Sequence, residues 1–220
     1  MDLKESSLHL DLKRWYFKEG DKIEVPIDDY IIDIVRDSLL IEIQTGNFSS
    51  IKKKLLDLLD RYNVRIVYPV VREKYLLTFS RDYKFRTRRK SSKKGNFIDI
   101  FDELVRIPEV LNRKNFSFDV VFVKIEEIRV KDGKGSRRRK GISIKDRKLT
   151  EVEDSILFNN KYHFLSLLPE DLVLPFSNKI LAKKMKLSVS KVRKITYTLR
   201  KINLIDIIGK RGNELFFNFV

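Results

Sequence analysis

The sequence predicts an α/β fold in which helices flank a mixed sheet, followed by a small C-terminal unit. Two observations carry this prediction. Residues 4–71 read in the order helix, strand, strand, strand, helix, strand, and residues 178–219 read as two short helices and a hairpin. In a chain of 220 residues, a hydrophobic content of 42% is enough to bury one sizeable core or two modest ones. We therefore expect two domains, residues 1–150 and residues 151–220.

The periodicity of apolar residues justifies each predicted element. Leu8, Leu12 and Trp15 recur at helical spacing, so residues 4–17 are expected to form a helix that the turn FKEGDK ends. Runs rich in Ile, Val and Phe and bounded by turn residues predict the strands. The expected strands cover residues 22–27, 30–36, 39–44, 64–71 and 116–130, and the further helices cover residues 49–62, 96–111 and 154–169.

Residues 31–44, IIDIVRDSLLIEIQ, place charged and polar side chains inside two apolar runs. If the central DS is a two-residue turn, Asp33 lies directly opposite Glu42, and Gln44 lies further along the same face. Two carboxylates that face each other across a ladder repel, and a divalent cation reverses that interaction. A register shifted by one residue would separate the two acids. A half-exposed hairpin with Glu42 and Gln44 in water would need no cation.

Together with the helix before it and the helix and strand after it, this hairpin resembles the PD-(D/E)xK nuclease superfamily, which has the restriction-endonuclease-like fold. Asp33 matches the first acid of that family, and Glu42-Ile43-Gln44 matches its E-x-K element with glutamine in place of lysine. Glu5 matches the additional acid that several branches carry on the first helix. The resemblance implies that Asp33, Glu42, Glu5 and the backbone carbonyl of Ile43 hold Mg²⁺ or Mn²⁺.

The activity that this resemblance implies is metal-dependent hydrolysis of phosphodiester bonds in DNA. The three acids and Gln44 would be the catalytic residues, and the amide of Gln44 would position the attacking water without supplying a positive charge. Lys52 and Lys53, on the helix that follows, could contact neighbouring phosphates. Each of these lysines could equally lie on the solvated face of an amphipathic helix.

The C-terminal segment predicts a helix over residues 178–185, a turn, a second helix over residues 189–203 and a hairpin around GKRGN. This order resembles a winged helix-turn-helix, in which the second helix enters the major groove of DNA and the wing contacts phosphate. The second helix is expected to bury an apolar stripe and to turn polar residues outward. The residues expected to contact DNA are Ser190, Lys191, Lys194, Thr198 and Lys201 on this helix and Lys210 and Arg211 at the wing tip. A winged domain used for protein contacts is the alternative.

The net charge of +16 indicates a polyanionic partner, which we expect to be double-stranded DNA. The segments TRRKSSKKG and KDGKGSRRRKG are predicted as basic loops that either clamp phosphates or form solvated surface. A regulator or scaffold without catalytic activity and an RNA nuclease are the competing interpretations. The oligomeric state stays open, with a homodimer as one option.

The remaining composition excludes several other classes of protein. The chain has no cysteine, which rules out disulfides and thiolate zinc sites, and no apolar run approaches the ~20 residues of a membrane span. We therefore expect a cytoplasmic protein without a membrane partner. The histidines His9 and His163 lie far apart in the sequence and are expected to be ordinary packing or surface residues.

Overall fold

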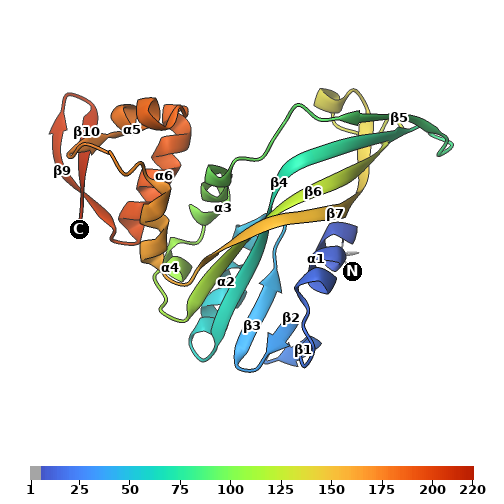
Figure 1. The fold of residues 1–220 in the computed structure, drawn as a ribbon, viewed down its shortest axis with the longest axis horizontal. Coiled ribbons are helices and arrows are strands. Elements are labelled where there is room, and N and C mark those ends of the chain that lie inside the picture. The colour runs from blue at the N-terminus through green and yellow to red at the C-terminus, as the bar shows by residue number, and fades with distance from the viewer. Residues whose placement is uncertain (1–5) are drawn as a thin grey trace. The chain divides into compact units, whose positions relative to one another are not determined.

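The computed structural model describes residues 6–220, and the predicted site residue Glu5 lies outside the described residues. The protein is α/β, with a large mixed sheet flanked by helices (Figure 1). The chain forms two compact units that interleave in sequence. The first unit contains residues 6–45, 66–97 and 119–156, and the second contains residues 46–65, 98–118 and 157–220. The domain boundary predicted near residue 150 lies inside strand β7 (Ile142–Phe158).

Helix α1 (Ser7–Tyr16) opens the first unit, and the side chain of Ser6 caps it by accepting a hydrogen bond from the His9 amide. Strands β1 (Lys22–Ile27), β2 (Tyr30–Arg36) and β3 (Leu39–Ile43) follow as an antiparallel meander. The sheet has the strand order β1-β2-β3-β4-β6-β7. Leu8, Leu12 and Tyr16 of α1 pack on apolar residues of β2, β3 and the strands beyond, which fixes the helix on the sheet. The predicted helix and hairpin are confirmed.

The first unit also contains most of three long strands, β4 (Asn63–Phe79), β6 (Phe116–Lys131) and β7. Strand β5 (Phe85–Lys90) pairs with the far end of β4 and is exposed along its whole length. The predicted loop TRRKSSKKG is therefore wrong over its first four residues, which belong to β5. The second predicted loop contains a short 3₁₀ turn, η2 (Arg137–Arg139).

In the second unit, helix α2 (Phe48–Leu59) packs with an aromatic core. The ring centroids of Phe48 and Phe118 are 6.0 Å apart, and Phe158 stacks on Phe164 at 4.7 Å. Residues 96–111 do not form the single predicted helix. They form a 3₁₀ turn η1 (Phe97–Ile100) and two four-residue helices, α3 (Phe101–Leu104) and α4 (Pro108–Leu111), because Pro108 cannot continue a helix.

The helix predicted over residues 154–169 is also wrong. β7 continues to Phe158, and residues Lys161–Leu167 form the 3₁₀ helix η3. Beyond it, the predicted helices are confirmed as α5 (Asn178–Met185) and α6 (Val189–Lys201). Strands β9 (Ile205–Arg211) and β10 (Glu214–Phe219) form the predicted hairpin, and the two-residue strand β8 (Phe176–Ser177) pairs with β10. No helix of residues 6–220 is long and apolar enough to cross a membrane.

Candidate functional site

The β2–β3 hairpin has the predicted register. Arg36 pairs with Leu39, and the ladder continues to the pair Ile34 and Ile41. Extended by one residue, this register would place Asp33 opposite Glu42, but the ladder itself ends at Ile34 and Ile41, and the Ile43 amide donates to the Asp33 carboxylate. Both acids are buried, with relative exposures of 9% and 7%, so the alternative in which Glu42 faces water is wrong. The hairpin therefore holds two carboxylates inside the first unit.

The Asp33 carboxylate is surrounded by hydrogen-bond donors. Its Oδ1 lies 3.0 Å from the Lys13 Nζ, and its Oδ2 lies 3.1 Å from the His9 Nε2. The backbone amide of Ile43 donates a further hydrogen bond of 2.8 Å to Oδ2. A buried carboxylate without such partners would cost several kcal/mol, so these contacts explain how an acid is tolerated between the apolar residues of β2.

These contacts also set the ionisation of Asp33. Burial on its own raises the pKa of this carboxyl, but the hydrogen bond and charge of His9, the Ile43 amide and Lys13 together outweigh burial. The pKa of Asp33 is therefore held below its usual range. At neutral pH the Asp33 carboxyl group is therefore an anion.

Helix α1 positions the two basic side chains. His9 and Lys13 are four residues apart, so they lie on the same face of the helix, and both project toward Asp33. The Lys13 side chain is 8% exposed, and its Nζ also lies 3.3 Å from Glu24 Oε1. The prediction that His9 is an ordinary packing or surface residue missed its contact with Asp33. The four-residue spacing was the one available signal for the pair.

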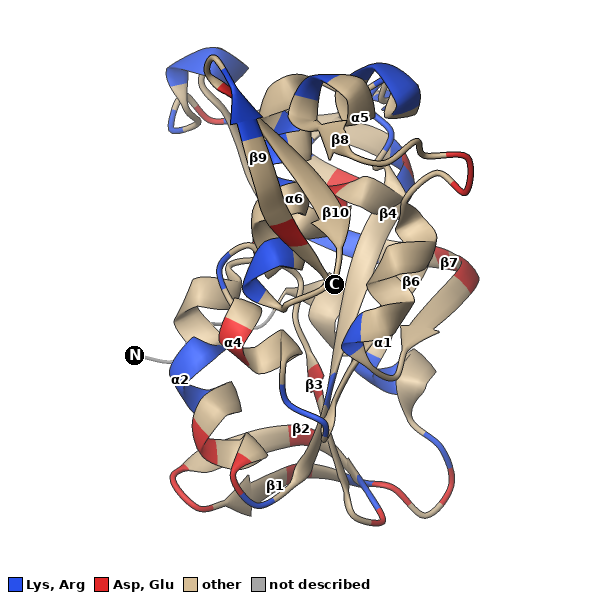
Figure 2. Cartoon of the chain, turned by 90° about the vertical axis from the view of Figure 1, so that its left-hand side faces the viewer, with Lys and Arg blue, Asp and Glu red and all other residues tan. Residues whose placement is uncertain are grey.

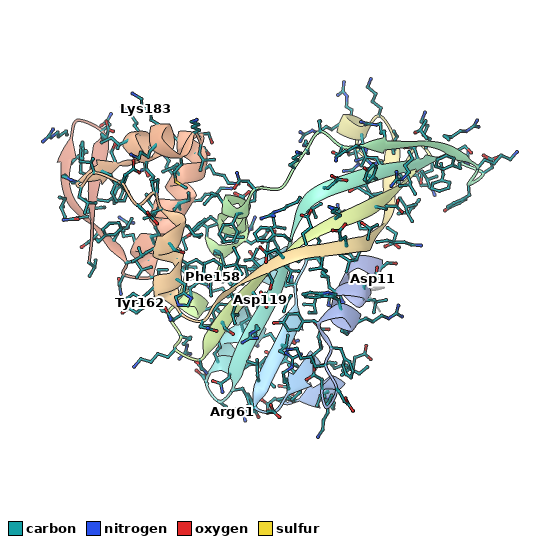
Figure 3. The ribbon with its side chains drawn as sticks, viewed as in Figure 1. Asp11, Arg61, Asp119, Phe158, Tyr162 and Lys183 are labelled. Atoms are coloured by element: carbon teal, nitrogen blue, oxygen red, sulfur yellow. The ribbon has the colours of Figure 1, made fainter. Side chains whose placement is uncertain are left out.

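A third buried acid of the first unit lies on β6. Asp119, labelled in Figure 3, accepts a hydrogen bond of 2.6 Å from the Tyr16 hydroxyl and is 6% exposed.

Gln44 follows β3 and is half-buried, and its backbone amide donates to the carbonyl of Val67 at 2.9 Å. Within residues 6–220, no group of three or more His, Cys, Asp or Glu side chains could share a metal ion.

The donor types at the hairpin, carboxylate and carbonyl oxygens, are those that Mg²⁺ and Mn²⁺ accept. Mg²⁺ is commonly held by one or two carboxylates and keeps several waters, so two carboxylates can suffice as the contribution of the protein. Asp33 and Glu42 would hold the ion, and the carbonyl of Ile43, the residue after Glu42, is a further hard oxygen. Binding would compete with Lys13 and His9 for the oxygens of Asp33.

The C-terminal site residues are only partly arranged as predicted. Lys191 forms ion pairs with Asp99 and Asp102, and the Lys194 Nζ lies 2.8 Å from Asp102 Oδ1. These two lysines therefore face acids of η1 and α3 within the second unit. Thr198 is fully buried, and its hydroxyl donates to the carbonyl of Lys194, so the prediction that it points outward is wrong.

Ser190 and Lys201 are exposed as predicted, and so are Lys210 and Arg211 at the end of β9. Figure 2 shows Lys and Arg at this end of the hairpin and on α5. The prediction missed Arg193, which is exposed on α6 and lines a groove of about 400 Å³ with side chains of α5 and the hairpin.

The two predicted lysines of α2 also differ from each other. The Lys52 Nζ lies 2.9 Å from Glu109 Oε2, so its charge is met inside the second unit, whereas Lys53 is exposed. Any contact that α2 makes with phosphate would therefore depend first on Lys53.

A family model described as a domain of unknown function, DUF8091, matches residues 6–159. The chain belongs to the DUF8091 family. A relative described as an uncharacterized protein, from Treponema pallidum (strain Nichols), is 37% identical over 172 residues, which cover 76% of this chain and 68% of that protein. No solved structure matches the chain significantly. The family match contains the hairpin, α1 and all the contacts of Asp33 described above.

Proposed function

We propose that this protein is a metal-dependent endonuclease that hydrolyses phosphodiester bonds in DNA. The observation that carries the proposal is the pair of buried acids, Asp33 and Glu42, on the adjacent strands β2 and β3 with Lys13 against one of them. The order α1-β1-β2-β3-α2-β4 supports the restriction-endonuclease-like fold on which the proposal depends.

In this proposal, Asp33 and Glu42 hold the metal ion and Gln44 orients water near the scissile phosphate. A bound divalent ion supplies Lewis-acid stabilisation of phosphate charge and a nucleophile at neutral pH. Gln44 cannot supply the positive charge of the lysine that it replaces. Lys13 is buried beside Asp33 and brings an ammonium group to the site from α1, so it is the residue we assign to that role.

We also propose that residues 176–219 form a winged helix that adds DNA affinity. The order β8-α5-α6-β9-β10 and the sheet order β8-β10-β9 support this assignment. The exposed residues that would meet DNA are Ser190, Arg193, Lys201, Lys210 and Arg211.

The test is incubation of the purified chain with plasmid DNA and with RNA, in Mg²⁺, in Mn²⁺ and in EDTA. We expect metal-dependent nicking of the plasmid that Glu42→Gln abolishes. The matched control is Glu19→Gln, which removes an exposed acid and should leave cleavage unchanged. Cleavage that persists in EDTA or in Glu42→Gln would refute the proposed site.

Binding of the ion can be measured without cleavage. Because a ligand that binds only the native state stabilises it, millimolar Mg²⁺ or Mn²⁺ should raise the melting temperature of the wild type but not of Glu42→Gln. If neither ion shifts the melting curve, with or without DNA, the nuclease assignment fails and only DNA binding remains.

A second candidate is a DNA-binding regulator or scaffold without catalytic activity. The observation that favours it is that both oxygens of Asp33 already meet donors, Lys13 on one side and His9 and the Ile43 amide on the other. Tight binding of plasmid without cleavage in either metal would select this candidate. Cleavage confined to the RNA substrate would select an RNA nuclease.

A further inference from the structure

The positive charge of the chain is concentrated in two short segments. Residues 80–95 and 131–148 together contain seventeen Lys and Arg but three Asp, a net charge of +14 against +16 for all 220 residues. The other 186 residues are therefore almost neutral. We call these two segments the distal basic surface.

The fold brings the two segments to the same end of the sheet in the first unit. Residues 80–95 contain the β4–β5 turn and β5, and residues 131–148 contain the β6–β7 connection with η2 (Figure 1). Both segments belong to the first unit, so they present their charges from one compact body.

The basic side chains of this surface are solvent-exposed, and most have no acidic partner. All seventeen are exposed. Lys84, Arg88, Lys90, Lys145 and Arg147 form ion pairs with acids. The other twelve form no ion pair with any acid of residues 6–220, and they are Arg81, Arg86, Arg89, Lys93, Lys94, Lys131, Lys134, Arg137, Arg138, Arg139, Lys140 and Lys148.

The backbone that carries these charges is ordered by its own contacts. Strand β5 pairs with β4 from Phe85 to Lys90, and the rings of Phe79 and Phe85 meet edge to face at 5.7 Å. The Arg88 guanidinium lies 3.9 Å from the centre of the Tyr75 ring. Because every residue of β5 is exposed, the strand buries nothing in the core, and its basic residues Arg86 and Arg89 form no ion pair with a described acid that folding would need.

We propose that the distal basic surface binds the phosphate backbone of nucleic acid and supplies most of the affinity of this protein for it. Side chains alternate along the regularly paired part of β5, so Arg88 and Lys90 leave one face of the strand and Arg89 leaves the other. A ribbon that is cationic on both faces fits a groove with phosphates on both sides, and a two-stranded ribbon fits the major groove of DNA. A flat anionic membrane would meet only one of the two faces.

This inference rests on the nucleic-acid partner proposed above, but it requires neither cleavage nor the winged helix. The experiment measures binding of the full chain to duplex DNA, in EDTA and over a range of salt concentrations. One variant combines Arg81→Gln, Arg89→Gln and Lys93→Gln, and a second combines Lys134→Gln, Arg137→Gln and Arg138→Gln. The matched control removes three exposed lysines that lie elsewhere, Lys18→Gln, Lys22→Gln and Lys114→Gln.

Each variant of the distal basic surface should bind duplex DNA about tenfold or more weakly than the wild type, and the slope of log K against log salt should become less steep by roughly 2 to 3. The control should change affinity by less than about threefold, because its residues add only to the general field of the protein. Parallel titrations with duplex RNA and single-stranded DNA identify which backbone is preferred.

Equal weakening of the control and the two variants would overturn the proposal, because the binding would then report net charge alone. Vesicles containing phosphatidylserine provide the other decisive comparison. If the variants lose vesicle binding while their DNA affinity is unchanged, the surface binds membrane and the proposal is refuted. Since all binding is measured without metal, a failure here leaves the cleavage test of Asp33 and Glu42 unaffected.

Discussion

On helix α6 the ammonium groups of Lys191 and Lys194 meet the carboxylates of Asp99 and Asp102, whereas in the distal basic surface Arg81 and Arg89 meet no described acid. Both segments have a high density of basic residues in the sequence. The first set of charges holds elements of the second unit together, and the second set remains available to a ligand. The number of Lys and Arg in a sequence therefore gives an upper limit on the positive charge available to a polyanion. Only the fold shows which of these side chains are already paired with acids.

This comparison predicts that substitutions of basic residues rank in opposite orders by their effect on stability and by their effect on nucleic-acid affinity. The more completely a basic side chain is paired and buried, the more its removal should reduce the free energy of unfolding. The more exposed and unpaired it is, the more its removal should reduce nucleic-acid affinity. The predictions below run from the largest expected change in stability to the smallest.

Lys13, on α1, extends the comparison to a buried and paired basic residue. Lys13→Met should reduce the free energy of unfolding by about 3 kcal/mol, because it leaves the buried Asp33 without its closest cation. Urea denaturation at pH 7 measures this loss. The double variant with Asp33→Asn should be more stable than the sum of the two single losses predicts, since both partners are then removed together. A loss below about 0.5 kcal/mol for Lys13→Met would contradict the pairing.

Glu127 provides a pH test of the same idea. It is 1% exposed and meets Lys74, Arg129 and Arg147. Burial alone raises the pKa of Glu127, but Arg129, Lys74 and Arg147 outweigh it and hold the pKa below its usual value. Glu127→Gln should therefore cost about 2 kcal/mol at pH 7, as expected for hydrogen bonds to a charged group.

The sign of the pH dependence follows from the lowered pKa. The stabilisation is present above the unfolded-state pKa of about 4.3 and is lost as pH falls through the lower folded-state value. The difference in unfolding free energy between the wild type and Glu127→Gln should therefore shrink from pH 5 to pH 3. A difference that stays constant over this range would mean that Glu127 is not held as an anion by its three basic neighbours.

The register of the β2–β3 hairpin could be predicted from the sequence, but the basic side chains that neutralise the charge of Asp33 could not. A two-residue turn and a side-chain period of two fix which residues of β2 and β3 face each other, and both are local properties. The contacts of Asp33 with His9 and Lys13 depend on the docking of α1 on the sheet, which joins residues about twenty positions apart. Helical spacing alone places those two residues on one face without saying what that face meets.

The other wrong predictions also arise because sequence patterns do not show which elements become neighbours in the fold. β5 is rich in Arg and Lys, which favours a loop in isolation, but pairing with β4 makes it a strand. Phe158 ends β7, which lies beside β6, although the local sequence predicts a helix. Thr198 can be buried because its hydroxyl donates a hydrogen bond to the carbonyl of Lys194 one turn earlier. Its polar residue type therefore predicted the wrong face of the helix. Each of these outcomes depends on a neighbouring element or a local hydrogen bond.

The α6 side of the comparison predicts an intermediate effect on stability. Burial lowers the pKa of Lys191, but its bonds to Asp99 and Asp102 outweigh this and raise the pKa above its usual value. Because Asp102 is partly exposed, solvent screens the pair, and Lys191→Met should cost only about 1 kcal/mol. The DNA affinity of Lys191→Met should change by less than about threefold, since the charge is already met.

Exposed residues of the same C-terminal region are the control for that prediction. The double variant Arg193→Gln with Arg211→Gln should reduce DNA affinity more than Lys191→Met does, and its melting temperature should stay unchanged. Lys183→Gln, on α5 (Figure 3), serves as an exposed reference that is not part of the groove lined by Arg193. If Lys191→Met weakens binding as much as the arginine variant, α6 presents its lysines to DNA despite their acidic partners.

The smallest change in stability should come from the distal basic surface. Lys134→Gln with Arg137→Gln and Arg138→Gln should alter the free energy of unfolding by less than about 0.5 kcal/mol, because these side chains are exposed and lose no ion pair. A slight gain would also be consistent, since three like charges that repel one another are removed. Urea denaturation at low salt is the most sensitive measurement, because surface repulsion is then least screened. A loss of 2 kcal/mol or more would show that these residues hold the β6–β7 connection together, and the predicted fall in DNA affinity would then reflect a damaged fold rather than a lost contact with phosphate.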